Sequence, residues 1–171
     1  MPLTYLGVNI IFTSLLLASG FRALQVGFAG MKPTLSPGDK FIYDAEYYRG
    51  NGAHHGELAV MRMQGAYTVK RVVAISGDTI HGKDRQVFLN GELQAERYIQ
   101  HAFPVGSNPE LDTFGPATVP SGKYFVLGDN RDISLDSRTP DFGLIDAPSI
   151  VGKPLYVYRL LGKGQLWREL H

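Results

Sequence analysis

The sequence contains no cysteine and comparatively few charged residues. Without a thiol among its 171 residues, the chain forms no disulfide and offers a metal no thiolate ligand. Charged residues make up 19% of the chain, below the roughly 25% that is usual in globular domains. The formal net charge is +1, so the composition favours neither a nucleic acid nor another strongly charged partner. A chain of this length, without internal repeats, predicts one domain with room for a small insertion.

Glycine and proline are frequent, with 20 and 10 residues, and both favour turns over long helices. Short segments rich in β-branched and aromatic residues follow one another from Leu24 onward. We expect strands over residues 41–43, 58–63, 67–75, 86–89, 92–94, 123–127 and 150–158. Asn90-Gly91 predicts a type I′ hairpin turn, and Pro154 predicts an edge position or a bulge in the last strand. Residues 95–120 are the least regular part. The sequence therefore predicts an all-β domain.

One uncharged run, residues 3–21, precedes the strands. Its 19 residues approach the roughly 20 that a helix needs to cross a bilayer, so we expect a membrane anchor over residues 1–23. Two other interpretations stay open. A cleavable signal peptide would be cut near Ala18-Ser19-Gly20, although no basic residue precedes the run, and a buried core helix would have a similar composition. Arg22 follows the run and by itself favours a cytoplasmic body.

A loop after the apolar run carries the first of three motifs. Residues 27–39 read GFAGMKPTLSPGD. Pro33 fixes its own φ at about −65° and keeps Lys32 extended, and Pro37-Gly38 is a strong turn signal. On its own, this stretch is a tight loop that leads into a β-domain.

The second motif is YTVKR, residues 67–71. In a strand, Lys70 shares one face with Thr68 and Val72, while Arg71 faces the other way. A lysine in the middle of a strand is more commonly a surface residue of an edge strand. The motif alone therefore assigns no chemistry to Lys70.

The third motif is GDNRDISLDSR, residues 128–138, which by itself is an acidic turn with internal ion pairs. In this order, the three motifs resemble the type I signal (leader) peptidase family. The first motif of that family reads S-M-x-P-T-L and the third reads G-D-N-R-D-x-S-x-D-S-R, which this chain matches at every fixed position. The resemblance covers about residues 25–158, nearly everything beyond the expected anchor.

Members of this family are membrane-bound Ser–Lys proteases that remove signal peptides from exported preproteins, cutting after small residues. By resemblance, Lys70 would be the general base and Ser134 would hydrogen-bond and orient its ammonium group. Asp136 and Arg138 would hold the loop as an ion pair, and Asp129 would support the same site. A lysine base must be desolvated, because its ordinary pKa of about 10.4 keeps it protonated at neutral pH.

The resemblance also implies an architecture. Residues 24–171 would form a signal-peptidase-like antiparallel β-domain with a small β insertion at about 83–118, preceded by one transmembrane helix. The anchor would cross the cell membrane once and leave the β-domain outside the cytoplasm, against the weak signal of Arg22. No cofactor is expected, and the pair His54-His55 lacks further ligands at clear spacing, so no metal is expected either. The sequence does not indicate an oligomeric state.

A substrate would bind as an extended peptide, by pairing with the backbone of a strand at residues 25–28. The residues expected to contact it are Gln25, Val26, Gly27, Phe28, Met31 and Pro33.

The departures from the family pattern fall at the chemistry. Gly30 stands at the position of the nucleophilic serine, and Phe28 stands where some members place a second serine that assists the oxyanion. Thr34 and Ser36, the nearest hydroxyls on the C-terminal side, lie beyond Pro33. Neither can take the place of the nucleophilic serine without remodelling the turn. We therefore expect a signal peptidase homologue that is inactive because Gly30 supplies no nucleophile. The alternative is a pseudo-peptidase that binds extended peptides or partners an active peptidase.

Overall fold

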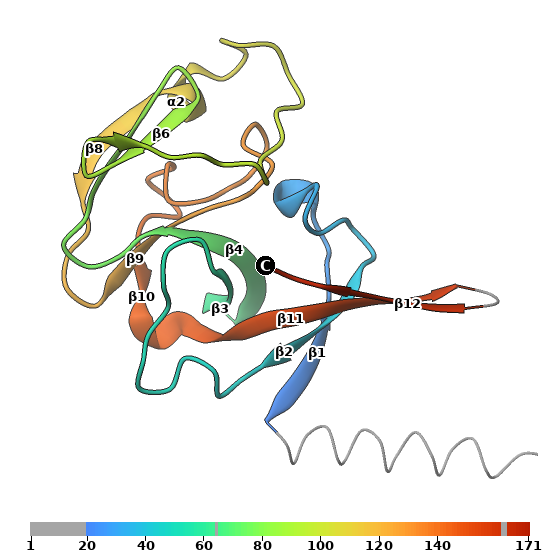
Figure 1. The fold of residues 1–171 in the computed structure, drawn as a ribbon. Helices are drawn as coiled ribbons and strands as arrows, with labels where there is room; N and C mark the ends of the chain where they lie inside the picture. The colour runs from blue at the N-terminus through green and yellow to red at the C-terminus, as the bar shows by residue number, and fades with distance from the viewer. Residues whose placement is uncertain (1–19, 64, 162–163) are drawn as a thin grey trace, which may run out of the picture.

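The structure, a computed structural model, describes residues 20–63, 65–161 and 164–171. Within them, strands form an eight-stranded and a four-stranded sheet (Figure 1). The strands of the larger sheet are β1 (Phe21–Gln25), β2 (Lys40–Asp44), β3 (Leu58–Met63), β4 (Ala66–Ala74), β9 (Lys123–Leu127), β10 (Ile145–Asp146), β11 (Ile150–Leu161) and β12 (Gly164–Glu169). The smaller sheet consists of β5 (Thr79–Lys83), β6 (Gln86–Leu89), β7 (Glu92–Leu93) and β8 (Phe114–Thr118). Short helices lie at η1 (Ala29–Met31), α2 (Pro109–Asp112) and η2 (Ala147–Ser149).

The larger sheet has the strand order β1-β2-β11-β3-β4-β9-β10, and β12 pairs with β11. The smaller sheet has the order β7-β6-β5-β8. Neighbouring strands pair antiparallel in both sheets. The all-β antiparallel class expected from the sequence is therefore confirmed for the described part of the chain.

Strand β3 shows how both faces of the larger sheet are covered. Leu58 and Val60 pack in one hydrophobic cluster with residues of β2 and β11, while Ala59 and Met61 pack in another with residues of β4 and β9. Side chains alternate between the faces of a strand, so two clusters on alternate residues mean that both faces are buried. Strand β4 pairs with β3, and its charged residues consequently lie inside the fold.

Two local predictions are confirmed. Asn90 and Gly91 have φ values of 53° and 88°, and both must be positive in the type I′ turn that joins β6 to β7. The register between β11 and β2 shifts between Pro154 and Tyr156, which is the bulge expected at the proline.

Three boundaries differ from those expected. The smaller sheet begins at Thr79 rather than at about residue 83, because β5 pairs with β6 and β8. Strand β8 lies within residues 95–120, which were expected to be irregular because Gly115 and Pro116 interrupt the strand pattern. Residues 21–23, assigned to the anchor, belong to β1, and Gly20 lies in the turn before it. Residues 3–19 of the uncharged run lie outside the described residues. Among the residues that are described, no helix has the length and hydrophobicity to cross a membrane.

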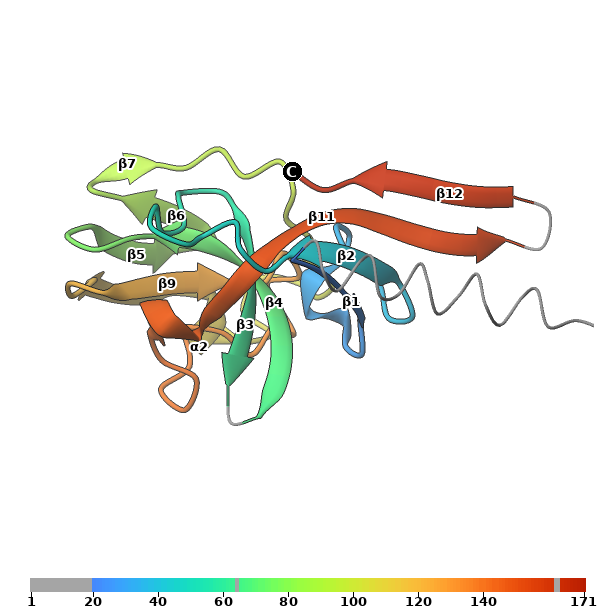
Figure 2. The ribbon, with the colours of Figure 1, turned by 90° about the horizontal axis from the view of Figure 1, so that it is seen from below.

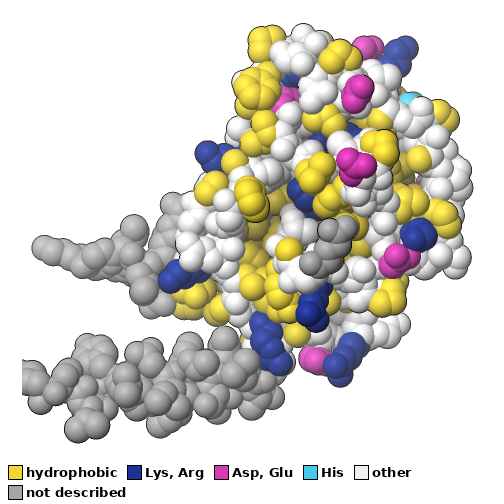
Figure 3. Space-filling model, turned by 180° about the vertical axis from the view of Figure 1, so that it is seen from behind, with side chains coloured by type: hydrophobic (Ala, Val, Ile, Leu, Met, Phe, Trp, Pro, Cys, Tyr) yellow, Lys and Arg dark blue, Asp and Glu magenta, His cyan; other side chains and the backbone are white. Residues whose placement is uncertain are grey.

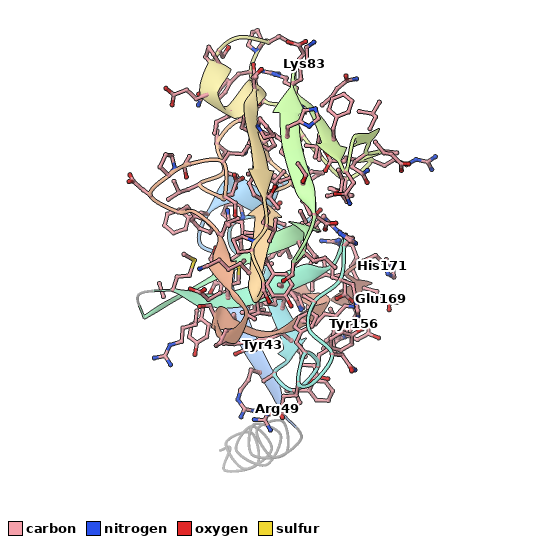
Figure 4. All side chains as sticks on the ribbon, turned by 90° about the vertical axis from the view of Figure 1, so that its left-hand side faces the viewer. Tyr43, Arg49, Lys83, Tyr156, Glu169 and His171 are labelled. Carbon is pink, nitrogen blue, oxygen red and sulfur yellow. The ribbon has the colours of Figure 1, made fainter. Side chains whose placement is uncertain are left out.

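The tail beyond residue 160 also contributes to the fold. Strand β12 runs back along the outer part of β11, and the pair projects beyond the rest of the sheet (Figure 2). Leu170 then returns to the core, and the His171 carbonyl oxygen accepts a hydrogen bond from Arg71 of β4 at 3.1 Å. The two sheets give the molecule an elongated outline, with Lys83 of the smaller sheet and Arg49 at opposite ends (Figure 4).

On the face shown in Figure 3, hydrophobic side chains lie between scattered charged groups. Phe28 of the first motif is 88% exposed, and Ile133 and Leu135 of the third motif are 45% and 59% exposed. The surface beside these two motifs is therefore partly apolar.

Candidate active site

The three motifs meet at Lys70. This residue pairs with Ala59 across β3 and β4, inside the larger sheet, and is only 6% exposed. Its Nζ donates a hydrogen bond of 2.7 Å to Ser134 Oγ and lies 5.8 Å from the centre of the Phe142 ring. The contact expected between Lys70 and Ser134 is therefore present, and Lys70 is not the surface lysine that its motif alone would allow.

Burial changes the acid–base behaviour of Lys70. Loss of hydration disfavours the ammonium and lowers the pKa of Lys70 to about 8, although the charge of Asp136 acts in the opposite direction. The positive charge of Arg138 adds to the lowering. The neutral amine, which a general base requires, is consequently accessible near neutral pH.

The loop of the third motif begins with a glycine that the packing requires. A Cβ on Gly128 would lie 2.0 Å from Ser134 Oγ and 2.4 Å from the Gly30 carbonyl oxygen, so no larger residue fits. The Gly128 N–H donates to Asp136 Oδ2 at 3.0 Å, and the Ser134 N–H donates to the Asn130 carbonyl oxygen at 3.1 Å. These contacts set the position of the Ser134 hydroxyl.

Asp136 and Arg138 form the expected ion pair, and neither side chain is more than 2% exposed. Arg138 donates from Nε and Nη2 to the two carboxylate oxygens, each at 2.9 Å, and from Nη1 to the Leu111 carbonyl oxygen at 3.1 Å. Burial acts to raise the pKa of Asp136, but the hydrogen bond and charge of Arg138 outweigh burial, so the pKa is lowered. The pair fixes the loop and ties it to α2.

Gly30, from the first motif, lies against Lys70 and Ser134. A Cβ built on Gly30 would lie 3.4 Å from Lys70 Nζ and 3.5 Å from Ser134 Oγ, which are ordinary contacts. The φ of Gly30 lies outside the left-handed region, so an L-residue fits the backbone there. Asn130 holds this peptide in place: its N–H donates to the Gly30 carbonyl oxygen at 3.1 Å and its Nδ2 to the Ala29 carbonyl oxygen at 3.3 Å.

Asp129 supports the site through the scaffold rather than by a hydrogen bond to Lys70. Its carboxylate accepts bonds of 2.9 and 2.7 Å from Nε and Nη2 of Arg71, and a further bond from the Thr34 hydroxyl. The Asp129 and Arg71 side chains are 0% and 3% exposed. Since Thr34, Arg71 and Asp129 belong to the first, second and third motifs, this buried network joins all three.

Sequence reasoning missed Arg71 and a second buried pair. Besides Asp129, Arg71 donates to the Gly56 carbonyl oxygen at 2.7 Å, and its Cζ lies 3.8 Å from the centre of the Tyr98 ring. Arg131 forms a two-point ion pair with Glu96, with bonds of 2.7 and 2.5 Å. The available signal for Arg71 was an arginine inside an apolar strand, since a buried arginine needs a partner.

The residues expected to bind substrate lie in different environments. Strand β1 ends at Gln25, so the expected strand over residues 25–28 is wrong. The Val26 N–H donates to the Asp39 carbonyl oxygen, and the Val26 carbonyl oxygen accepts from the Gly38 N–H. Beyond Val26 the two segments no longer pair. Gly27 and Pro33 are exposed, like Phe28. Met31 is 4% exposed and packs in the core, which indicates a packing role. A contact between these residues and a peptide stays a prediction.

Comparison with known proteins identifies the family. Residues 3–159 match the family model described as "Signal peptidase, peptidase S26". The chain belongs to the signal peptidase I family. The signal peptidase I of Bacillus licheniformis is 34% identical over 158 residues, which cover 88% of this chain and 83% of that protein. Signal peptidase IB of Staphylococcus aureus (strain COL) is 31% identical over 163 residues, covering 86% of this chain and 84% of that protein.

A crystal structure of a signal peptidase I from Enterococcus faecalis V583 is 28% identical in sequence and has a TM-score of 0.49, covering 59% of this chain and 95% of that one. Signal peptidase I enzymes are serine endopeptidases. This homologue has a buried lysine, a serine hydrogen-bonded to that lysine, and glycine at the position expected for the nucleophile.

Proposed function

We propose that this chain is a membrane-anchored signal peptidase I homologue that binds the extended signal peptides of exported preproteins but does not cleave them. The observation that carries the proposal is the distance of 3.4 Å between Lys70 Nζ and a Cβ at residue 30. A serine there would bring its hydroxyl next to Lys70, and the chain has glycine instead. Truncation of such a nucleophile typically removes several orders of magnitude in rate.

The remaining groups have defined roles in this proposal. Neutral Lys70 would take the proton of a hydroxyl at residue 30, while Ser134 orients the amine. The hydroxyl oxygen would attack the scissile carbonyl carbon, and the backbone N–H of residue 30 would donate to the oxyanion that forms. Asp136 with Arg138, and Asp129 with Arg71, would keep these groups in position. The attacking oxygen is absent because residue 30 is glycine, and Phe28 supplies no second side-chain donor to the oxyanion.

Peptide binding is proposed at strand β1. This strand is at the end of the larger sheet, so one row of its backbone N–H and C=O groups faces away from β2. An extended peptide can add to such an edge by backbone hydrogen bonds. The chain continues from Gln25 to Gly30 within six residues, which would bring a peptide paired with β1 to the Lys70 site.

The membrane location is proposed from residues 3–21. This uncharged run precedes β1, and we propose that it anchors the β-domain on the extracytoplasmic face of the cell membrane. There the site would meet preproteins as they emerge.

The test is cleavage of a preprotein with an Ala-x-Ala site in detergent by three proteins: wild type, Gly30→Ser, and Gly30→Ser combined with Lys70→Ala. We expect no turnover by the wild type, cleavage by Gly30→Ser, and loss of that cleavage in the double variant. If the wild type cleaves as well as Gly30→Ser, another nucleophile operates and the proposal is wrong. If no variant cleaves, the glycine at residue 30 is not what prevents cleavage, and that part of the proposal is wrong.

A further inference from the structure

Gly30 leaves a small space beside the buried ammonium of Lys70. A Cβ at this position would have Lys70 Nζ at 3.4 Å and both Oγ and Cα of Ser134 at 3.5 Å. Lys70 and Ser134 are 6% and 3% exposed, whereas Gly30 is partly exposed. The space is therefore lined by two polar atoms and borders the surface at Gly30.

Lys70 has donors to spare at this place. An ammonium group has three N–H donors, and within the described part of the chain Lys70 donates to one acceptor, Ser134 Oγ. A buried charge with unused donors costs free energy, and an anionic acceptor offsets that cost better than a neutral one. The geometry therefore favours an anion in the space beside Gly30.

The neighbouring charges leave the ammonium uncompensated. Asp136 and Asp129 act on Lys70 electrostatically, but Arg138 binds both oxygens of Asp136 and Arg71 binds both oxygens of Asp129. The positive charges of Lys70, Arg138 and Arg71 are thus balanced by only two carboxylates, those of Asp136 and Asp129. One positive charge, that of Lys70, remains for a ligand.

We propose that this site binds the free C-terminal carboxylate of an extended peptide that ends in a small residue, with one carboxylate oxygen beside Lys70 Nζ. The inference rests on the proposed function, because it uses the same peptide site, and it adds that the preferred ligand resembles a cleaved signal peptide rather than an intact preprotein. A serine at residue 30 would place its Oγ in this space and obstruct the carboxylate. Glycine removes that obstacle.

Affinity should follow the protonation of Lys70. Below pH 8 the ammonium predominates and affinity is at its maximum, because the pKa of Lys70 is about 8. A bound carboxylate favours the ammonium and raises this pKa in the complex, so above pH 8 each pH unit weakens binding by up to about tenfold. The charged groups that face Lys70 are Asp136, Arg138, Asp129 and, through Asp129, Arg71.

The test compares two fluorescent peptides of one sequence ending in Ala-x-Ala, one with a free carboxylate and one amidated. Binding to the full chain in detergent is measured by fluorescence anisotropy. At pH 7 we expect the carboxylate peptide to bind at least about tenfold more tightly, since a hydrogen bond to a charged group contributes roughly that much. At pH 9.5 this preference should shrink, while the amidated peptide binds as before.

Two variants and a control locate the carboxylate. Gly30→Ala puts a methyl group in the space at ordinary contact distances, so the fold is retained and the carboxylate preference is lost. Lys70→Met removes the charge at similar volume and should lose the preference too. If a thermal melt shows that Lys70→Met is not folded, the Gly30→Ala variant alone decides whether the carboxylate binds beside residue 30. Lys123→Met, the control, removes a lysine that pairs with Asp146 at the surface, and should keep the preference.

Each outcome bears on one claim. Equal affinity of the wild type for the two peptides overturns the inference, while cleavage by Gly30→Ser would leave the proposed function standing. A preference that survives in both Gly30→Ala and Lys70→Met places the carboxylate elsewhere and also overturns the inference. Failure of both peptides to bind, with no cleavage by Gly30→Ser, would refute the inference and the proposed function together.

Discussion

The variant Gly30→Ser should have a rate that reports the protonation state of Lys70. Only the neutral amine can accept the serine proton, so the rate follows the neutral fraction. With a pKa of about 8, that fraction is roughly a tenth at pH 7, about a half at pH 8 and roughly nine tenths at pH 9. We therefore expect kcat/KM to rise about tenfold between pH 7 and pH 9 and then to level off. A lysine with an ordinary pKa of about 10.4 would give a rate still rising about tenfold per unit at pH 9.

The assay is single-turnover cleavage of an Ala-x-Ala preprotein in detergent between pH 6 and 10, at constant ionic strength. The double variant Gly30→Ser with Lys70→Ala supplies the background rate at each pH. Circular dichroism at the two extremes checks that the fold persists. A profile that continues to rise through pH 10 would show that burial does not lower the pKa of Lys70 as the structure indicates. A flat profile would show that the rate does not follow the titration of Lys70 near pH 8.

Three further predictions concern the scaffold and the anchor. Arg71→Met should lower the free energy of unfolding by about 3–5 kcal/mol in a urea titration, because it leaves Asp129 buried without its partner, whereas Lys123→Met at an exposed pair should cost less than about 1 kcal/mol; similar values for the two variants would contradict this. Gly128→Ala should abolish peptide binding and lower the melting temperature, because its methyl group would overlap Ser134 Oγ, and unchanged binding would show that the loop can rearrange freely. Carbonate extraction of membranes from expressing cells should leave the full-length protein in the pellet if residues 3–21 are an anchor. Release of the full-length chain would refute the anchor, and a shorter product starting near Gly20 would indicate a cleaved signal peptide instead.

Much of the fold could be predicted from local sequence signals. Strand β3 has the bounds expected from residues 58–63, and the β6–β7 turn has the two positive φ values that Asn90-Gly91 favours. Strand β8 could not be predicted in the same way, because Gly115 and Pro116 both disfavour strands and its pairing with β5 is a long-range contact. The start of the smaller sheet at Thr79 could not be predicted either, because only the pairing of β5 with β6 and β8 places residues 79–83 in that sheet.

The candidate site divides along similar lines. The motifs identified Lys70, Ser134 and the Asp136–Arg138 pair, and the contacts expected among them are present. The network around Arg71 was not anticipated, because strand alternation only indicated that its side chain faces away from Lys70. What lies on that face, Asp129 and the Thr34 hydroxyl, comes from distant parts of the chain.

By itself, the sequence determined the β-rich class, most strand positions, the family motifs and the presence of Gly30 at the position expected for the nucleophile, because all of these are properties of residues close together in the chain. Only the tertiary structure decided that Lys70 loses its hydration and that a Cβ at Gly30 would lie 3.4 Å from its Nζ. Both depend on how residues 30, 70 and 134, which are far apart in the sequence, pack against one another. Desolvation depends on everything that surrounds a charge, and that surrounding exists only in the folded chain.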